Sequence, residues 1–558
     1  MSRVAGSEAV SEGMADFHLD PKTAPAFPVA AKASMGDAQL RRNVRHATDV
    51  IQAKRARVVG EMPDWQELRT AGEAIRRHTM RHLDFYLEEF ERNCTAAGGV
   101  VHWARDAEEA RRIVVELAKA SGGDGVGGGT TTEVIKIKSM TTEEIQLNKA
   151  LEAAGIHAYE TDLAELIIQL GHDQPSHIVV PALHKNRAQI REIFRREMNL
   201  PELGGTPEDL ADAARRFLRE KFLRVKTAVS GANFLIAETG GVCIVESEGN
   251  GRMCLTLPET LIAVAGIDKV ISRYQDLEVF LQLLPRSATG ERMNPYNSIW
   301  TGVDRTHVSE SRRGAPAFQH GTRAFRDGPR SFHIVLMDNA RTEILADEEA
   351  RQTLHCIRCG ACQNACPVYQ QTGGHAYGSV YAGPIGASLT PQLMEMHHAQ
   401  SLPYASSLCG ACYEVCPVKI NIPEVLIHLR HKVVEQQTAG FRILANPEAM
   451  ALKMAGVVFR NQGVFRASQK MGRVAELPLS HKDAEGVGWI DWLPGMLGGW
   501  TQSRDLREMP KQTFRQWFEQ RGKDGAGRRP GDPGGDPDMD ATAKRTENAA
   551  RRRSSDER

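Results

Sequence analysis

The chain has 558 residues, which is too long for a single core. Hydrophobic residues make up 41% of it and charged residues 25%, a composition typical of soluble globular proteins. Its 70 Lys and Arg residues balance 70 Asp and Glu residues, which argues against a dedicated nucleic-acid-binding protein. A mean hydropathy of −0.38, the lack of a long apolar run and an acidic N-terminal segment argue against a membrane span and a secretory signal. We therefore expect a cytoplasmic protein of several domains.

The N-terminal part of the chain divides into two patterns. Residues 1–45 are rich in Ala, Ser and Pro with little periodicity, so we expect a flexible leader. A helical pattern follows between residues 49 and 95. Its apolar residues recur at three- to five-residue steps among charges: Ile75, Met80, Leu83, Tyr86 and Phe90.

Alternating helix and strand patterns predict an α/β domain next. Helical AEEARRIVVELAKA (107–120) leads through the Gly-rich loop SGGDGVGGGT to the strand EVIKIKS (133–139). A helix is expected to begin at the N-cap Thr141, with Glu144 three residues later as in a capping box. The strand IHAYET, the helix LAELIIQL and the strand HIVVPAL (177–183) complete a βαβαβ unit. Such a unit requires a parallel sheet with covered faces.

Composition divides the whole chain into six segments. These are the leader (1–45), an α/β domain (64–300), a Gly-, Arg- and Pro-rich linker or arm (301–332), a mainly helical cysteine domain (335–437), a Trp-containing helical segment (442–518) and a tail (521–558). Within the α/β domain, residues 232–252 predict two strands around a Gly-Gly turn. The tail has no Val, Ile, Leu, Phe, Tyr or Trp, so it cannot bury a core and is expected to be disordered.

Seven of the 10 cysteines lie in two motifs, which indicates metal ligands in a reducing compartment and not a disulfide scaffold. The motifs are CIRCGACQNACPVY and SLCGACYEVCPVKI. Two-residue spacers let one loop wrap three thiolates around a cuboidal [4Fe–4S] cluster, and the Cys before Pro ligates the other cluster. This rule assigns Cys356, Cys359, Cys362 and Cys416 to cluster one, and Cys366, Cys409 and Cys412 to cluster two.

Cluster two is then one thiolate short, because the register of the first motif puts Ser406 at the missing position. Three interpretations are open. An oxygen or imidazole ligand completes the cube, the centre is a three-cysteine [3Fe–4S] cluster, or the fourth iron stays open to solvent or a partner. The other three cysteines have no supporting spacing: Cys94, Cys243 and Cys254. Four histidines lie near the motifs, where surface and capping roles are commoner than ligation: His397, His398, His428 and His431.

Zinc is the structural alternative, but the first motif has too many thiols too close together for one tetrahedral site, so we favour clusters. Gly360 and Gly410, each directly after a ligand, let the backbone approach the inorganic sulfides. Clusters of this kind move one electron at a time. The sequence has no well-formed GxGxxG or P-loop motif, so we expect the electron source and sink in partner subunits.

The α/β domain offers weaker candidates for a site. SGGDGVGGGT lacks the Lys-Ser/Thr of a phosphate-binding loop, which favours a flexible connection. Three glutamates around the hairpin could supply acid–base chemistry, although water-facing strand positions are commoner: Glu238, Glu246 and Glu248. Four residues near the strand C-termini could line a pocket, where open α/β sheets bind ligands: Lys138, Thr141, Asn250 and Arg252.

At the cysteine motifs and beyond, the sequence resembles the lactate utilization protein B family. The resemblance rests on CIRCGACQNACPVY, GGHAYGSVYAGPIGA (373–387) and LPYASSLCGACYEVCPVKINIPE (402–424). Upstream, KSMTTEEI and ETGGVCIVESEGNGR resemble the LUD domain, which is similar in fold to ribose-phosphate isomerases and CoA-transferases. The likeness covers about residues 64–518, and the Gly-rich loop and the tail depart from it.

This resemblance implies a function as well as a fold. It implies a LUD domain, a dicluster 4Fe-4S ferredoxin domain and a C-terminal lactate-utilization segment, with two [4Fe–4S] clusters on the seven cysteines. It also implies a non-catalytic electron-transfer subunit of a complex that oxidises L-lactate to pyruvate, beside a cysteine-rich oxidoreductase subunit and a second LUD-domain subunit. Three alternatives remain open: a complex for another 2-hydroxy acid or glycerol phosphate, an enzyme or ligand-binding protein acting through its LUD domain, and a redox sensor.

Overall fold

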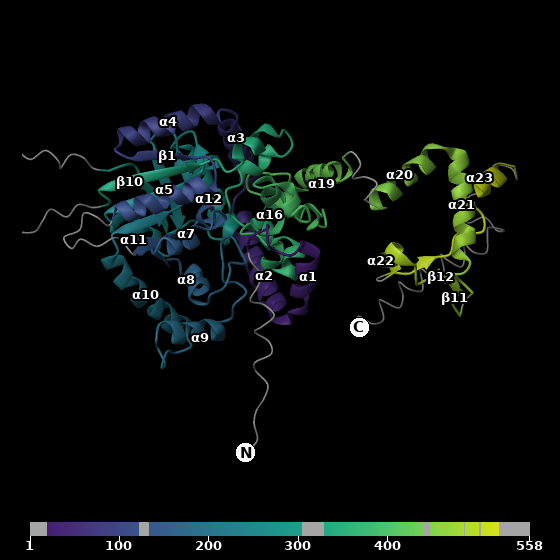
Figure 1. Cartoon of the computed structure of the whole chain (residues 1–558), viewed down its shortest axis with the longest axis horizontal. Coiled ribbons are helices and arrows are strands. Elements are labelled where there is room, and N and C mark those ends of the chain that lie inside the picture. Colours follow the sequence, from purple (N-terminus) through teal and green to yellow (C-terminus); the bar gives the residue numbers. More distant parts are fainter. Residues whose placement is uncertain are drawn as a thin grey trace, which may run out of the picture. The chain divides into compact units, whose positions relative to one another are not determined.

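The computed structural model describes residues 19–121, 133–303, 328–439, 447–484, 486–501 and 504–523. The chain divides into two compact units, Met1–Gln437 and Thr438–Arg558 (Figure 1). Among the helices of the described ranges, none is long and apolar enough to cross a bilayer. The start of the expected leader, the Gly-rich loop, most of the expected arm and nearly all of the expected tail lie outside these ranges.

The prediction of a flexible leader is wrong for the described residues from Phe27 onward, because they are helical. The first helices of the chain are α1 (Phe27–Gly36), α2 (Ala38–Gly60), α3 (Trp65–Arg81) and α4 (Leu83–Ala96). In α1 the buried residues Phe27, Ala30, Ala31 and Ser34 recur at helical spacing. The Phe27 ring packs against Tyr377 with 4.9 Å between centroids. This short, Ala-rich stripe is ordered because it packs against a segment 350 residues later in the chain.

A six-stranded parallel sheet forms the core of the first unit, in the order β1-β10-β7-β4-β2-β3. Its strands are β1 (Val100–Ala104), β2 (Glu133–Lys136), β3 (His157–Glu160), β4 (Thr227–Ser230), β7 (Thr260–Gly266) and β10 (Ser331–Met337). The helices between them are α5 (Ala107–Ala120), α6 (Met140–Glu144), α7 (Leu147–Ala153), α8 (Leu163–Leu170), α9 (Arg187–Glu197), α10 (Pro207–Arg224), α11 (Asn250–Thr256) and α12 (Asp276–Ala288). The parallel α/β fold predicted from the sequence is confirmed.

Both faces of this sheet are buried, as parallel sheets require. In β7, Ile262 and Val264 belong to the hydrophobic layer that contains Val114 of α5. The alternate residues Leu261 and Ala263 point to the opposite layer. The period of two along the strand therefore separates the two hydrophobic layers.

A smaller mixed sheet belongs to the second layer, in the order β8-β5-β6-β9. Its strands are β5 (Phe234–Ile236), β6 (Gly241–Glu246), β8 (Val270–Ile271) and β9 (Tyr296–Trp300). β5 and β6 form the antiparallel hairpin that the sequence predicts. The turn needs Gly240, whose φ is +65° and whose Cβ, if added, would lie 2.2 Å from the main-chain nitrogen of Cys94.

Two local predictions in the α/β domain are wrong. The helix α6 is capped by Ser139, whose hydroxyl accepts from the N–H of Thr142, so Thr141 lies inside the helix and is not the N-cap. Residues 177–183 form turns instead of a strand. There Nδ1 of His177 accepts from the N–H groups of Val179 and Val180, both at 3.0 Å, which bends the chain away from extended backbone.

β10 lies between β1 and β7 and pairs with both, in register from His333 to Met337 with β1. The expected cysteine domain starts at residue 335, inside this strand, so the chain returns to the α/β sheet before it enters the cysteine segment. The other domain limits given above remain predictions.

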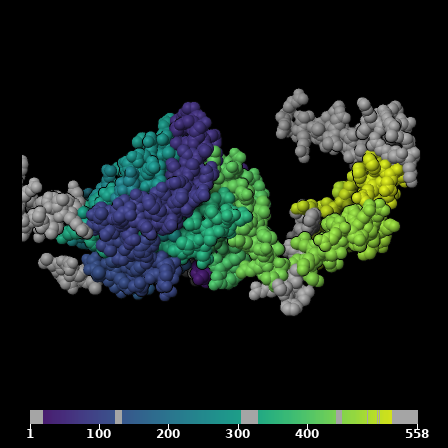
Figure 2. Space-filling model, turned by 90° about the horizontal axis from the view of Figure 1, so that it is seen from above, coloured from purple at the N-terminus to yellow at the C-terminus, as the bar shows by residue number. Residues whose placement is uncertain are grey.

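The cysteine segment contains mostly short helices. Its helices are α13 (Arg341–Ala346), α14 (Ala361–Asn364), α15 (Pro367–Thr372), α16 (Gly383–Leu389), α17 (Met396–Ala399), α18 (Ala411–Val415) and α19 (Ile422–Thr438). The cysteine motifs run through α14, α15 and α18. N-terminal residues (purple) lie directly against residues of the middle of the chain (teal) and of the cysteine segment (green) on the surface of the first unit (Figure 2). The first 437 residues thus share one packed body.

The second unit contains helices and a small antiparallel sheet. Its elements are α20 (Pro447–Arg460), α21 (Gln462–Glu476), α22 (Gly498–Thr501), α23 (Phe514–Lys523), β11 (His481–Lys482), β12 (Gly488–Ile490) and β13 (Leu506–Arg507). The sheet order is β11-β12-β13. Large apolar side chains are exposed on its helices, including Phe459 at 72% and Phe514 at 73%.

Candidate iron–sulfur centre

Each cysteine motif folds as a loop that runs directly into a short helix. Gly360 (φ 72°) precedes α14 and Gly410 (φ 84°) precedes α18, and this left-handed backbone favours glycine. The first loop aims a main-chain N–H at sulfur, since the nitrogen of Arg358 lies 3.4 Å from Sγ of Cys356. Donors of this kind stabilise negative charge on a thiolate.

The four thiols expected for cluster one lie close together, because Cys356 raises the pKa of each of the other three. Burial, then Cys416, then Cys356 raise the pKa of Cys359 well above its usual range. Burial raises the pKa of Cys416 to about 11, with Cys356 adding to it and the Ile420 N–H, at 3.3 Å, opposing it. Burial raises the pKa of Cys362, and Cys356 and Cys359 raise it further. These are the four thiols that the spacing rule assigns to cluster one.

The remaining three thiols form a second group. Burial raises the pKa of Cys412 to about 12, and Cys366 and Cys409 raise it further. Cys409 also raises the pKa of Cys366. Cys409 is exposed, and the Ala411 N–H and the Ser407 hydroxyl lower its pKa. The two groups adjoin each other, because Cys412 also acts on the first-group thiol Cys362.

The expected fourth position of cluster two is engaged elsewhere. The Ser406 hydroxyl accepts from the Leu408 N–H at 3.1 Å, whereas the neighbouring Ser407 faces Cys409. Three of the four histidines near the motifs pair with carboxylates: His428 with Asp347 at 2.9 Å, His431 with Glu435 at 3.1 Å and His397 with Glu395 at 3.3 Å. The other three cysteines are buried in the α/β domain: Cys94, Cys243 and Cys254.

The chemistry of this donor set fits iron–sulfur clusters. All ten cysteines are free thiols. Packing neutral thiols together in an apolar interior makes each harder to ionise, and binding a multivalent cation reverses this by coordinating the thiolates. Six of the seven motif cysteines are buried or half-buried, and burial raises the pKa of five of them, whereas Cys409 is exposed.

Two arginines that the sequence analysis did not single out, the buried Arg69 and the half-buried Arg55, lie beside the first group. Arg69 of α3 donates to the carbonyl oxygens of Cys416 at 2.9 Å and Tyr413 at 3.1 Å. Arg55 of α2 donates to the carbonyl oxygen of Val415 at 3.1 Å. Arg69 lies on the buried stripe of α3 that begins at Trp65, so its helical spacing was the available signal.

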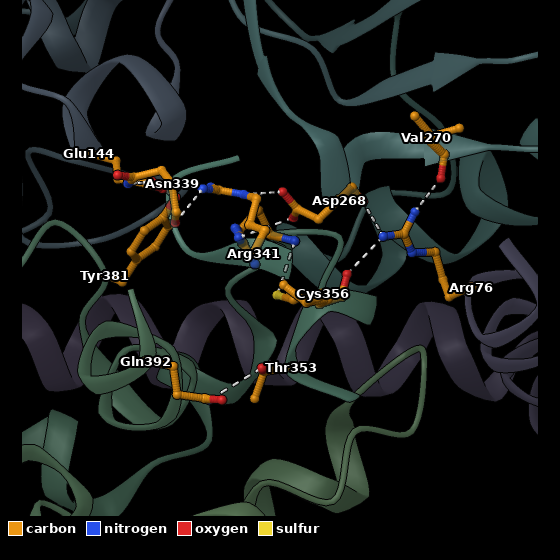
Figure 3. Close-up of polar contacts among 12 residues, drawn as sticks. Arg76, Glu144, Asp268, Val270, Asn339, Arg341, Thr353, Cys356, Tyr381 and Gln392 are labelled. Atoms are coloured by element: carbon orange, nitrogen blue, oxygen red, sulfur yellow. Dashed lines mark hydrogen bonds and ion pairs between the residues drawn. The ribbon is translucent and has the colours of Figure 1, made fainter. Parts of the chain in front are cut away.

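A buried polar network joins the α/β sheet to the loop before cluster one (Figure 3). Arg341 donates to Asp268 at 2.6 Å and to both carboxylate oxygens of Glu144 at 3.0 and 2.8 Å. Tyr381 donates its hydroxyl to Glu144 at 2.6 Å, and Arg358 lies 3.5 Å from Asp268. The arginines hold the pKa of Asp268 well below its usual range despite burial. The network therefore ties β7, α6, α13 and the first cysteine loop together.

A further arginine, Arg76, belongs to this buried polar network. Arg76 of α3 is 1% exposed and donates to the carbonyl oxygens of Val270 at 2.7 Å, Leu354 at 2.8 Å and Asp268 (Figure 3). Burial lowers the pKa of its guanidinium to about 10. Its donors satisfy carbonyl oxygens of the α/β domain and of Leu354, two residues before the first motif.

Comparison with known proteins identifies the family. Residues 87–337 match the model for the LUD domain, residues 352–420 the 4Fe-4S dicluster domain, and residues 428–523 the C-terminal domain of lactate utilisation protein B. Lactate utilization protein B of Shouchella clausii is 40% identical over 90% of this chain and 98% of its own length. Lactate utilization protein B 1 of Bacillus mycoides is 40% identical over 88% and 95%. The chain belongs to the lactate utilization protein B family.

The family assignment confirms the resemblance seen in the motifs. Lactate utilization protein B of Bacillus thuringiensis is 38% identical over 88% of this chain and 96% of its own length. A crystal structure of a DUF162 family protein from Deinococcus radiodurans is 13% identical and covers 46% of this chain and 98% of that one. Its TM-score of 0.22 is too low to support an argument.

The remaining candidate residues of the α/β domain fall into two sets. Lys138, Thr141 and Asn250 line one cavity, and the Arg252 side chain lies over the Tyr296 ring instead. The three hairpin glutamates accept main-chain N–H groups: Glu238 from Tyr274, Glu246 from Gly251 and Arg252, and Glu248 from Leu163. These contacts give all three a structural role in turns and helix starts.

Proposed function

We propose that this chain is the iron–sulfur electron-transfer subunit of a complex that oxidises L-lactate to pyruvate. The grouping of the thiols carries the proposal: Cys416 faces the first motif and Cys366 faces the second, as two crossed clusters need. The family's printed name supports the link to lactate utilization. Oxidation of L-lactate releases two electrons, and when bound the clusters transfer electrons one at a time.

We propose the ligand sets that the spacing rule predicts. Cluster one takes Cys356, Cys359, Cys362 and Cys416, and cluster two takes Cys366, Cys409 and Cys412. The fourth position of cluster two is filled by an oxygen or imidazole ligand, or the cluster is a [3Fe–4S] centre, or its fourth iron is open to solvent or a partner. The Ser407 hydroxyl faces Cys409, so it is a better candidate for an oxygen ligand than the Ser406 hydroxyl, which accepts from the Leu408 N–H.

The surroundings of the two groups support different roles for them. Around the first group, Arg55 and Arg69 hold the Cys416 loop through its carbonyl oxygens. Cys409 of the second group is exposed, so electrons can enter or leave there over a short distance. We therefore propose that a partner docks over Cys409.

Partner subunits are part of this proposal. The resemblance implies a cysteine-rich oxidoreductase subunit and a second LUD-domain subunit. Exposed apolar side chains on α20 and α23, such as Phe459 and Phe514, support a protein-binding role for the second unit. The free thiols support a reducing compartment, the cytoplasm, as the site of action.

Metal analysis of the anaerobically purified full chain tests the proposal. About eight irons per chain with two interacting [4Fe–4S] signals in EPR support a non-cysteine ligand at cluster two, and about seven with an oxidised [3Fe–4S] signal support an incomplete cluster. Cys359→Ser should lower the iron content by about half, while the matched control Cys254→Ser, in the α/β core, should retain it. Zinc in place of iron, or wild-type iron in Cys359→Ser, contradicts the proposal.

A further inference from the structure

A cavity of about 240 Å³ lies inside the first unit at the carboxyl ends of the parallel strands. Its wall includes Lys138 and Ser139 after β2, Gly231 after β4, and Lys269 after β7. This is the edge at which open α/β sheets bind ligands. The volume equals that of about eight water molecules, below the range of about 300–1,000 Å³ for drug-sized ligands, so the cavity suits a small metabolite.

Three basic and three acidic side chains lie on the wall of this cavity: Lys138, Lys269 and Arg358, and Asp162, Glu246 and Glu291. Lys269 is only 7% exposed, and within the described part of the chain its ammonium has no hydrogen bond or ion pair. Burial beside Arg358 lowers the pKa of Lys269 to about 7, a penalty that a bound anion would reduce. Lys138 lies on the same wall and donates only to the carbonyl oxygen of Ile178 among the described residues. Two lysines with spare donors thus face one small space.

The acidic side chains on the wall form no ion pair with either lysine within the described part of the chain. Asp162 accepts from the Ala164 and Glu165 N–H groups at the start of α8. Glu246 accepts two N–H groups at the start of α11. Glu291 pairs with Lys54 at 3.5 Å. Each is held by a donor other than Lys269 or Lys138.

The rest of the lining favours an organic anion over a free inorganic one. Apolar side chains cover much of the wall: Ile137, Ile178, Val179, Ile244, Leu284 and Ala288. Hydroxyl groups of Ser139 and Thr141 and the amide of Asn250 provide a few polar contacts. Such a wall suits a short carbon chain with one charged end and an adjacent polar substituent.

We propose that this space, the Lys269 cavity, binds a small organic carboxylate, with the carboxylate against Lys269 and Lys138 and the carbon chain against the apolar wall. The site is separate from the cluster ligands and does not depend on their assignment. Its wall includes Arg358, which lies between Cys356 and Cys359 in the chain. Occupancy therefore adds negative charge beside the first cysteine loop.

Calorimetry and ligand-observed NMR on the anaerobically purified full chain test the proposal. The probes are L-lactate and pyruvate as carboxylates, propane-1,2-diol as a neutral analogue, and inorganic phosphate as an anion without a carbon chain. Both carboxylates should bind, and the diol and phosphate should bind at least tenfold more weakly. No carboxylate binding at tens of millimolar, or tighter binding of phosphate, overturns the proposal.

Three variants locate the site. Lys269→Met should weaken carboxylate binding at least tenfold, since it removes a charge-assisted contact, and Lys138→Met should weaken it several-fold. Lys226→Met is the matched control, because Lys226 is 60% exposed, pairs with Glu259 and lies outside the cavity wall; it should bind as the wild type does. If Lys269→Met does not fold, Lys138→Met decides alone. Wild-type affinity in the folded cavity variants overturns the proposal, and unchanged iron content separates that result from cluster loss.

Discussion

The buried network around Arg341 allows a stability prediction from its geometry. Its guanidinium is 1% exposed and serves two carboxylates, Asp268 and Glu144, whose side chains are 0% and 6% exposed. Arg341→Met removes both ion pairs. Asp268 keeps Arg358 at 3.5 Å, and Glu144 keeps hydrogen bonds from Asn339 and Tyr381. Removing one partner of a buried pair costs about 3–5 kcal/mol, and the remaining contacts place this loss near about 3 kcal/mol.

The pH dependence of this loss follows from the carboxylates. In the wild type, burial raises the pKa of Glu144, but the charge and hydrogen bonds of Arg341 outweigh this effect and hold that pKa below its usual value. The stability from that lowered pKa is present above the unfolded-state value and is lost as the pH falls through the folded-state value. Without Arg341, burial raises the pKa of Glu144 above its usual value. The folded variant then binds more protons than the unfolded chain, so its stability falls as the pH rises from 5 to 8.

Anaerobic urea denaturation, followed by circular dichroism and tryptophan fluorescence, measures both effects. The double variant Glu144→Gln with Arg341→Met should recover part of the loss, because no carboxylate is left unpaired at that position. Arg292→Met is the control, since Arg292 is 67% exposed and pairs with Glu61 on the surface; it should change stability little. A loss of unfolding free energy in Arg341→Met below about 1 kcal/mol, or a loss that is the same at pH 5 and pH 8, would refute the reasoning.

Three further predictions concern separate parts of the chain. Ser407→Cys should slow the loss of cluster absorbance in air several-fold, and Ser406→Cys should not, because its hydroxyl position already accepts a main-chain N–H. Gly240→Ala should lower the free energy of unfolding by about 3 kcal/mol through a main-chain clash, against about 1 kcal/mol for Gly155→Ala, which has open space; equal losses would contradict this. Phe459→Ser should abolish co-purification of partner subunits while iron content and circular dichroism stay unchanged.

Local sequence patterns were sufficient to predict an element where the interactions that form it lie within that segment. The alternation of Val134 and Ile135 in β2, the helix at Ala107–Ala120 and the Gly240 turn follow from periodicity and backbone freedom. The cysteine spacings predict thiol groups because a two-residue spacer sets how far apart neighbouring ligands lie. In these places the physical cause lies within a few residues.

Only the tertiary structure decided features whose partners are distant in sequence. α1 is ordered because Phe27 packs against Tyr377, and the turn at residues 177–183 is held by the cysteine segment, where Gln363 accepts from the Ile178 N–H at 3.2 Å. Arg341 is buried because Glu144 and Asp268 come to it from other elements of the α/β domain. Burying a charge is stable only beside its partner. Sequence periodicity therefore determined the elements and thiol spacings of this chain, while packing between distant segments decided which charges could be buried and where the Lys269 cavity formed.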